Sequence, residues 1–392
     1  MRLLKLQSNL RNLHHAPKMP PVGVSYLLIR AMDEQKGACM NKLSDDHHLG
    51  VSRRGLLKTI AAAGAGAWLS SGRGSAQGNP RRIDVHHHFQ PPVDGNNGLK
   101  WWTPEKSLEM MDKFGVAFAM MSNPGASTSA YDGTQKGNDA ARRSNEFGAK
   151  LVSQYPKRIG LFAAIPMNNT DGALKEIEYA LDTLKADGFQ IGSSTGDKWP
   201  GDPQYLPIFQ EIHRRKASVF IHPFVNRCCK TLMPGIPESV VEYDLDTTRC
   251  VTSMLYNGTL SSCPDMKVIL NHSGAAIPML AGRIKDRVPG AQTSNFGTPK
   301  TNSDGINAKI PKGVFYELRK LYYECAHAAY PFPMAAMMKL APPTQYLFGT
   351  DYPAEPMEST VDHLPENDLS PEIQRAMYRE NAERLYPRLK SL

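Results

Sequence analysis

The chain has few cysteines and no long apolar run, and these two shortages exclude several classes of protein. Only 6 of the 392 residues are cysteine and none forms a C-x-x-C pair, so neither a dense disulfide framework nor a cysteine-based zinc module is expected. The weakly apolar stretch 59–69 is too short, and too rich in Ala and Gly, to span a membrane. A disulfide stays open among the cysteines that follow Cys39, which are Cys228, Cys229, Cys250, Cys263 and Cys325.

Motifs that bind RNA or DNA are also lacking, and the net charge does not point to nucleic acid. Residues 1–76 hold 11 of the 46 Lys and Arg residues but only 4 of the 38 Asp and Glu residues. Most of the formal charge of +8 therefore belongs to this segment, and the rest of the chain is close to neutral. We expect no nucleic-acid partner.

The basic segment has the features of an export signal. Ser52-Arg53-Arg54-Gly55-Leu56-Leu57-Lys58 is followed by a mild apolar region and then by small residues that suit a signal peptidase, up to Ala76. This pattern resembles a twin-arginine signal. We expect residues 1–76 to be a mostly disordered leader, with Met40 as a candidate true start. The mature protein, 77–392, would be periplasmic or secreted, with no membrane anchor after cleavage.

Short apolar runs alternate with amphipathic stretches through the rest of the chain. The runs predict strands at 83–88, 117–122, 159–165, 188–192, 218–222, 267–271, 321–325 and 345–349. The amphipathic stretches predict helices at 104–114, 136–154, 171–186, 205–215, 238–257, 278–287, 331–340 and 371–385. Eight strand–helix units predict one α/β domain, a parallel (β/α)₈ TIM barrel. An open doubly wound sheet is the alternative, but no Gly-rich phosphate loop follows the first strand.

Residues that can bind a metal stand at the ends of four predicted strands. Side chains alternate along a strand, so His86 and His88 share one face, while His87 points away from the metal. In a barrel of this class the carboxyl ends of the strands meet at one rim, where the chemistry takes place. Neutral imidazole is a common ligand of zinc-like ions. The candidate residues at this rim are His86, His88, His222, His272 and Asp351.

These residues stand in motifs that resemble the amidohydrolase superfamily. The motifs are IDVHHHFQPP at 83–92, FIHPF at 220–224, NHSGAAIPMLAGRI at 271–284, LYYECA at 321–326 and LFGTDYP at 347–353. The resemblance is strongest to the branch of aminocarboxymuconate-semialdehyde decarboxylase and the nonoxidative salicylate- and resorcylate-type decarboxylases. It covers about Arg82 to Leu385 and implies a metal-dependent barrel enzyme.

The resemblance also implies roles for particular residues. His86, His88, His222 and Asp351 would hold one divalent ion, since no Lys follows strand four to bridge a second. Zinc suits this His-rich set, and manganese is the alternative. His272 would transfer a proton or orient the substrate.

Substrate contacts are less defined by the resemblance. In related decarboxylases the position of Arg283 reaches a neighbouring subunit's substrate, which implies a homodimer; an exposed helix arginine is the alternative. Trp101 and Trp102 would form an aromatic wall or pack at the barrel mouth, and His327 is a candidate pocket residue. Relatives often have Asp-Thr where this chain has Glu324-Cys325.

Two reactions use this set of residues. The first is decarboxylation of a small aromatic carboxylic acid, with Asp351 or His272 delivering a proton to the ring carbon as carbon dioxide leaves. The second is hydrolysis of a small lactone, ester or amide, with Asp351 accepting a proton from metal-bound water. Export weakly favours hydrolysis, whereas the resemblance favours decarboxylation. A metal-stabilised binding protein without chemistry is a third hypothesis, which the full ligand set disfavours.

Overall fold

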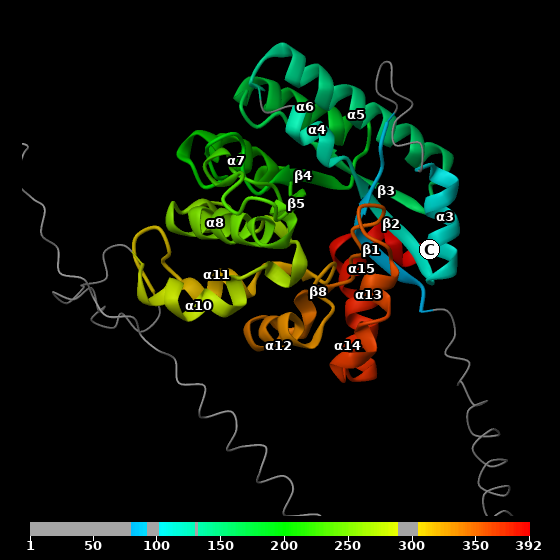
Figure 1. Cartoon of the computed structure of the whole chain (residues 1–392). Coiled ribbons are helices and arrows are strands. Elements are labelled where there is room, and N and C mark those ends of the chain that lie inside the picture. The colour runs from blue at the N-terminus through cyan, green and yellow to red at the C-terminus, as the bar shows by residue number, and fades with distance from the viewer. Residues whose placement is uncertain (1–79, 92–101, 130–131, 289–304) are drawn as a thin grey trace, which may run out of the picture. The chain divides into compact units, whose positions relative to one another are not determined.

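The computed structural model describes residues 80–91, 102–129, 132–288 and 305–392 (Figure 1). The predicted leader, residues 1–76, and Trp101 lie outside the described residues. In the described part of the chain, no helix is both long and apolar enough to cross a membrane.

Eight parallel strands form one sheet whose order follows the chain. They are β1 (Arg82–His88), β2 (Val116–Ser122), β3 (Ile159–Ala164), β4 (Gly188–Gly192), β5 (Ser218–His222), β6 (Lys267–Leu270), β7 (Tyr322–Glu324) and β8 (Tyr346–Leu347). Backbone hydrogen bonds join the last strand to the first: Val85 N donates to Phe348 O at 3.0 Å, and Asp351 N donates to His86 O at 2.7 Å. The predicted (β/α)₈ TIM barrel is confirmed, and every predicted strand is present with bounds that differ by at most two residues.

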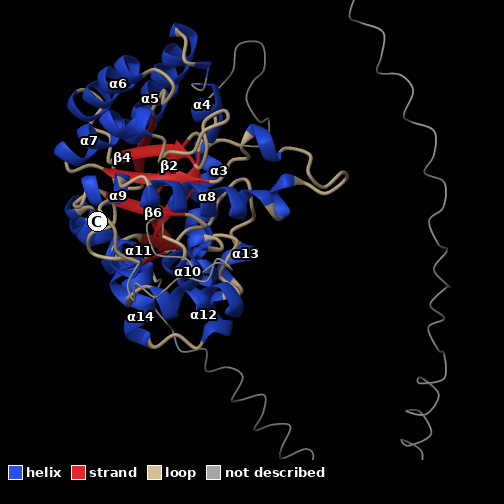
Figure 2. Cartoon of the chain, turned by 90° about the vertical axis from the view of Figure 1, so that its left-hand side faces the viewer, coloured by secondary structure: helices blue, strands red, loops and turns tan. Residues whose placement is uncertain are grey.

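Helices surround the strands (Figure 2). The α-helices are α3 (Pro104–Lys113), α4 (Pro124–Ser129), α5 (Gln135–Gln154), α6 (Thr170–Asp182), α7 (Leu206–Arg214), α8 (Glu242–Tyr256), α9 (Thr259–Ser262), α10 (Ile277–Asp286), α11 (Val314–Arg319), α12 (Pro331–Leu340), α13 (Glu358–Val361), α14 (Pro371–Arg375) and α15 (Asn381–Leu385). The short helical turns are η2 (Pro203–Tyr205), η3 (Arg227–Cys229), η4 (Glu238–Val240), η5 (His272–Gly274), η6 (Pro343–Gln345), η7 (Leu364–Asn367), η8 (Ala376–Glu380) and η9 (Pro387–Ser391).

The helix predictions need three corrections. The helix expected to end at Ala186 ends at Asp182. The helix expected to begin at Glu238 begins at Glu242, because Glu238–Val240 forms a separate 3₁₀ turn. The helix expected over 371–385 is not regular throughout, because the π turn η8 lies between α14 and α15. The short helices α4, α9, α11 and α13 were not predicted, since four to six residues are too few for a periodic pattern.

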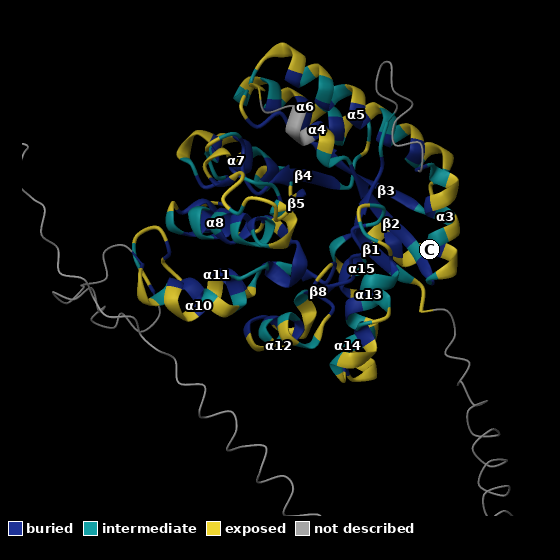
Figure 3. Ribbon diagram, in the orientation of Figure 1, coloured by how far each residue is buried: buried dark blue, intermediate teal, exposed yellow. Residues whose placement is uncertain are grey.

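The apolar core has two layers, one inside the barrel and one between the strands and the helices. Figure 3 shows that the strands are buried, whereas the helices carry exposed residues as well. The inner layer includes Phe118, Phe162 and Phe220, all of which are buried. The C-terminal segment closes this layer, because Tyr386 packs into it and its hydroxyl lies 2.8 Å from Ser218 Oγ on β5. The other end of the barrel is left for polar groups.

An irregularity in β1 determines the direction in which its histidine side chains point. The pairing of β1 with β2 shifts register before His87. Val85 belongs to the inner apolar layer, and the next side chain, His86, also faces inward, with its ring 4.7 Å from the Phe220 ring. A β-bulge allows two consecutive side chains to share a face and is common beside active sites. His87 then points outward and His88 inward, as the alternation of side chains predicts after the bulge.

Candidate metal centre

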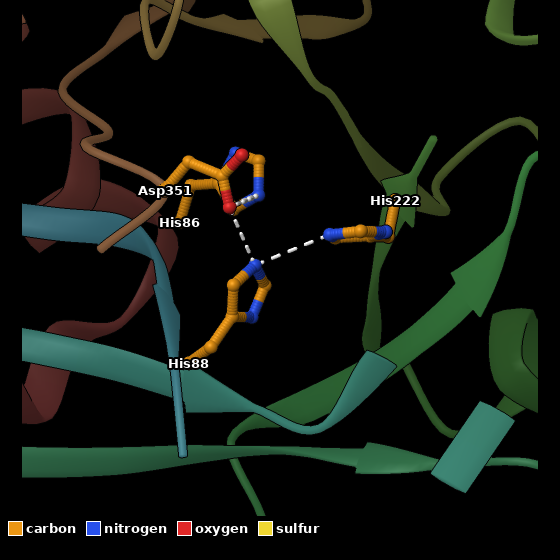
Figure 4. A group of neighbouring side chains, drawn as sticks. All are labelled: His86, His88, His222 and Asp351. Atoms are coloured by element: carbon orange, nitrogen blue, oxygen red, sulfur yellow. Dashed lines mark hydrogen bonds and ion pairs between the residues drawn. The ribbon is translucent and has the colours of Figure 1, made fainter. Parts of the chain in front are cut away.

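Four side chains meet at the carboxyl ends of the strands (Figure 4). They are His86 and His88 from β1, His222 from β5 and Asp351 from the segment after β8, and one ligand atom of each lies within 4.8 Å of the others. Asp351 Oδ1 lies 2.8 Å from His88 Nε2 and 3.2 Å from His86 Nε2. His222 Nε2 lies 3.1 Å from His88 Nε2. All four residues are buried.

The outer nitrogen of each histidine is held by the protein, which aims the inner nitrogen at the centre. His222 Nδ1 donates to the carbonyl oxygen of Pro223 at 2.9 Å. A carbonyl can only accept, so His222 Nε2 presents a lone pair. His88 Nδ1 lies 3.1 Å from Ser122 Oγ on β2. Such outer partners fix the tautomer and orientation of metal-binding histidines.

Glu324 holds His86 in the same way, and sequence analysis did not assign it a role. This carboxylate at the end of β7 is fully buried, and His86 Nδ1 donates to its Oε1 at 2.9 Å. The backbone N–H groups of His272 and Ala326 donate to Glu324 at 2.9 and 2.6 Å. A Cβ at Gly349 would collide with the Glu324 carboxylate, so glycine is required there. The one available signal was that Glu324 departs from the pattern of related proteins.

His272 lies beside the four ligands without joining their cluster. Its ring stacks on His86 with 5.8 Å between centroids, and its Nε2 is 4.0 Å from Asp351 Oδ2. Its Nδ1 donates to Asp244 Oδ1 on α8 at 2.8 Å. Asp244 thereby orients His272, a contact that could not be predicted because the two residues are 28 positions apart in the chain. The structure also brings His327 to the site, where its Nε2 lies 2.8 Å from Asp351 Oδ2.

Three of these residues have strained backbones. His272, His327 and Asp351 have φ values of +50°, +55° and +60°. Residues other than glycine avoid this left-handed region, which costs about 1–3 kcal/mol per residue and is retained where surrounding structure enforces it. The bond from His272 N to Glu324 is one such restraint. The site is therefore held in place at a cost in stability.

Burial and neighbouring charges set the protonation of the metal-free centre. Burial disfavours the charged form of His86, but the carboxylates of Asp351 and Glu324 outweigh it and raise the pKa of His86 to about 10. Burial lowers the pKa of His88 and holds that of His222 well below its ordinary value. Two imidazoles are therefore neutral at pH 7 and ready to bind a cation.

Asp351 is ionised in this environment. Burial alone would raise its pKa, but the charge of His86 and hydrogen bonds from His327 and His88 hold the pKa well below its ordinary value. Burial lowers the pKa of His327, but its hydrogen bond to Asp351 outweighs this and raises it. An anionic carboxylate in contact with three imidazoles suits a divalent cation.

The donor atoms fit a bound metal ion. His86 Nε2 is fully buried and makes no hydrogen bond, although it faces Asp351 Oδ1. The facing nitrogens of His88 and His222 can share at most one proton. Buried polar atoms without partners are costly, and a cation among three nitrogens and one carboxylate oxygen satisfies all of them. The described residues thus contain a buried His/Asp metal site.

The remaining predicted residues lie farther from the centre. Arg283 is exposed on α10 and makes no ion pair with the described residues. Trp102 is 7% exposed and packs in the layer between strands and helices, where its indole N–H donates to Ser107 Oγ at 2.9 Å. Ser107 in turn lies 3.1 Å from His87 Nε2. These contacts are those of a packed side chain, the alternative considered for Trp102.

A cavity of about 460 Å³ opens beside the metal site. Phe224 lines it and lies 5.2 Å from the His222 ring, and Tyr243, which precedes Asp244, lines it too. Its wall carries two basic residues, Arg227 and Lys230, and two acidic ones, Asp132 and Glu238. A larger cavity of about 890 Å³ lies between α8 and the turn at 307–309. The metal-site residues line neither cavity, but Phe224 and Tyr243 of the smaller one adjoin His222 and Asp244. The smaller cavity is therefore the candidate substrate site.

Comparison with known proteins identifies the family. A model of the family described as Amidohydrolase matches residues 83–388, which include every residue of the metal site. The chain belongs to the amidohydrolase family. The expectation drawn from the five motifs is confirmed.

The relatives of this amidohydrolase are decarboxylases. Decarboxylase yanB of Aspergillus niger is 30% identical over 337 residues, which cover 78% of this chain and 88% of that protein. The 6-methylsalicylic acid decarboxylase of Penicillium expansum is 29% identical over 328 residues, 79% of this chain and 98% of that protein. The solved structure of a dihydroxybenzoic acid decarboxylase from Polaromonas, with bound manganese and 2-nitroresorcinol, matches with a TM-score of 0.62 and 19% identity over 78% of this chain and 96% of that chain. At that identity the structural match shows the fold alone.

Proposed function

We propose that this amidohydrolase is a metal-dependent nonoxidative decarboxylase of a small aromatic carboxylic acid. The observation that carries the proposal is the position of His272. Its Nδ1 is anchored to Asp244, while its Nε2 is buried, has no hydrogen-bond partner and faces the metal site. An imidazole held in this way suits transfer of a proton to a substrate. The decarboxylases among the relatives support the same reaction.

Each residue has a part in this reaction. His86, His88, His222 and Asp351 would hold the ion, which when bound supplies positive charge for the substrate carboxylate and an ortho oxygen. His272 would donate a proton from Nε2 to the ring carbon as the carbon–carbon bond breaks and carbon dioxide leaves. His272 is a better donor than Asp351, because the low pKa of Asp351 keeps that carboxylate ionised.

We also propose the identity of the ion and the number bound per chain. We propose one zinc ion per chain, because imidazoles dominate the ligand set. Manganese, which the Polaromonas decarboxylase holds, is the alternative. Elemental analysis of the purified protein distinguishes the two ions and their stoichiometry.

A panel of substrates tests the reaction. The metal-loaded protein is incubated with hydroxybenzoates and, separately, with aryl lactones, and carbon dioxide and acid release are followed. We expect carbon dioxide from a hydroxybenzoate, and His272→Ala should keep its metal but lose ~10²-fold or more in turnover. His363→Ala, which removes a histidine paired with Glu366 away from the centre, is the matched control. Hydrolysis of a lactone without carbon dioxide from any acid would favour the hydrolase.

We propose a homodimer in which Arg283 reaches the substrate carboxylate of the partner subunit. The exposed guanidinium on α10 supports this, because it is available for a planar carboxylate.

We also propose export by the twin-arginine route to the periplasm, supported by Arg53-Arg54 and the small residues before Gln77. A fusion of residues 40–80 to a reporter that survives only when exported folded should reach the periplasm. Arg53→Lys with Arg54→Lys should block it, and unchanged export of this variant would contradict the assignment.

A further inference from the structure

Cys228 and Cys229 are neighbours in the sequence, and their sulfur atoms are also neighbours in space. The two Sγ atoms lie 2.6 Å apart, not far above the covalent S–S distance of about 2.05 Å. Both residues belong to the 3₁₀ turn η3, in which consecutive side chains normally diverge by about 120°. The two side chains have therefore turned toward each other. No other pair of the described cysteines makes a sulfur–sulfur contact.

Backbone hydrogen bonds hold the pair in this turn. Buried Asn226 binds both amides: its Oδ1 accepts from Cys228 N at 3.2 Å, and its carbonyl accepts from Cys229 N at 2.9 Å. Arg227 N donates to Gly196 O at 3.0 Å, which ties the turn to the loop after β4. The cysteines thus lie on a restrained turn between two strand ends of the barrel.

The two thiols differ in access. Cys228 is exposed, whereas Cys229 is 8% exposed. Burial, with the contact to Cys228, raises the pKa of the Cys229 thiol to about 11. A reagent in solution therefore meets Cys228 first, and Cys229 is placed behind it.

The pair adjoins the candidate substrate cavity. Arg227 and Lys230, on either side of the cysteines, both line it. Phe224 lines it as well and lies 5.2 Å from the His222 ring. Only five residues separate His222 from Cys228, so a change in the turn acts on the cavity wall through a short stretch of chain.

We propose that Cys228 and Cys229 are a redox modification site that forms a reversible vicinal disulfide with a small anionic disulfide, such as glutathione disulfide, as oxidant, and that this bond alters the substrate cavity. Arg227 and Lys230 flank the pair and make no ion pair with the described residues, so each can bind a carboxylate of the reagent, although Asp132 and Glu238 also line the cavity. A trans peptide fixes neighbouring Cα atoms about 3.8 Å apart, less than the usual 4.4–6.8 Å across a disulfide. The bond is therefore strained and easily reduced, which suits a switch better than a permanent cross-link.

The chemistry balances in two exchanges. The Cys228 thiolate attacks one sulfur of the oxidant, the oxidant's S–S bond breaks, and one small thiol leaves. Cys229 sulfur then attacks Cys228 sulfur in the mixed disulfide, and the second small thiol leaves. Two electrons pass from the cysteines to the oxidant, and the two cysteine protons end on the two released thiols.

Peptide mapping of the full-length, metal-loaded protein after treatment with glutathione disulfide tests the bond. A single peptide that contains both cysteines should lose two hydrogen atoms, and dithiothreitol should restore them. Cys229→Ser should stop at the first exchange and keep glutathione on Cys228. Cys228→Ser, which lacks the exposed thiol, should remain unmodified in this peptide. Wild-type protein that keeps glutathione on Cys228 with a free Cys229 thiol would overturn the proposal.

The effect on the cavity has its own measurement. Oxidation should raise the Michaelis constant about two- to fivefold, the scale of a displaced exposed charge contact, and change kcat less. Cys228→Ser, treated identically, should show no change. An oxidised pair with an unchanged Michaelis constant would refute the link to the cavity. This readout rests on the proposed decarboxylase function, whereas the peptide map needs no substrate, so the two can fail separately.

Discussion

Glu324→Gln tests whether one buried carboxylate organises the centre. The substitution keeps the size of the side chain but removes its charge and replaces one acceptor oxygen with an NH₂ group. Oε1 can still accept from His86 Nδ1 and His272 N, whereas the N–H of Ala326, now 2.6 Å from Oε2, would face a donor. One charged hydrogen bond is lost and a buried N–H is left unpaired.

The expected cost follows from these contacts. The substitution removes a hydrogen bond to a charged group and leaves the Ala326 N–H unpaired. Together these changes should lower the free energy of unfolding by about 2–4 kcal/mol. Because the neutral amide oxygen holds His86 Nδ1 more weakly than the carboxylate does, metal affinity should fall about 10- to 100-fold. Denaturant unfolding of the metal-free protein measures the first effect, and competition with a chromophoric chelator measures the second.

A matched control separates charge from position. Glu109→Gln removes a carboxylate that is exposed on α3, and it should leave stability within about 0.5 kcal/mol and metal affinity unchanged. A Glu324→Gln protein with wild-type affinity and stability would refute the assignment of Glu324 as the residue that holds His86.

Three further predictions concern the metal and the subunits. His88→Ala and Asp351→Ala should each lose most of the bound ion, because each removes a ligand; elemental analysis that finds one full equivalent in both variants would contradict the ligand set. At pH 7 the metal-free His86, whose pKa is raised to about 10, is protonated, so metal binding should release about one proton and tighten about tenfold per pH unit up to pH 9. The stability that His86 contributes to the metal-free fold is complete below its unfolded pKa of about 6.5 and is lost as pH rises through about 10. Calorimetry in buffers of different ionisation enthalpy measures the release, and an affinity that stays flat from pH 7 to 9 would exclude this proton. Mixing inactive His272→Ala chains with Arg283→Ala chains should restore some activity in hybrid dimers; no recovery after verified chain exchange would place Arg283 outside the partner's site.

The barrel could be predicted because its strands are short apolar runs of regular spacing, and the motif residues could be predicted because they follow those runs. His88 and His222 end strands, His86 lies two residues before the end of β1, and Asp351 lies four residues after β8, so the sequence alone placed them at one rim. The bulge that turns His86 inward could not be predicted, since it depends on the register with β2.

The residues that orient His86 and His272 were harder to predict. Asp244 lies within a helix, and nothing in its neighbours distinguishes it from a solvated acid until α8 is packed beside His272. Glu324 stands in a strand of three residues, where its burial depends on a glycine, Gly349, from the segment after β8. For Trp102 the sequence left an aromatic wall and ordinary packing open, and the residue packs between strands and helices.

The contact between β1 and the segment after β8 determines when the protein can acquire its ion. His88 and Asp351 are 263 residues apart, yet they lie 2.8 Å from each other. The centre therefore cannot exist until β8 has closed against β1, which makes metal insertion a late step that follows synthesis of nearly the whole chain. Under the proposed export of the folded protein, the ion would be selected from the metal pool of the compartment in which the barrel closes, and not from the pool that surrounds the enzyme where it works.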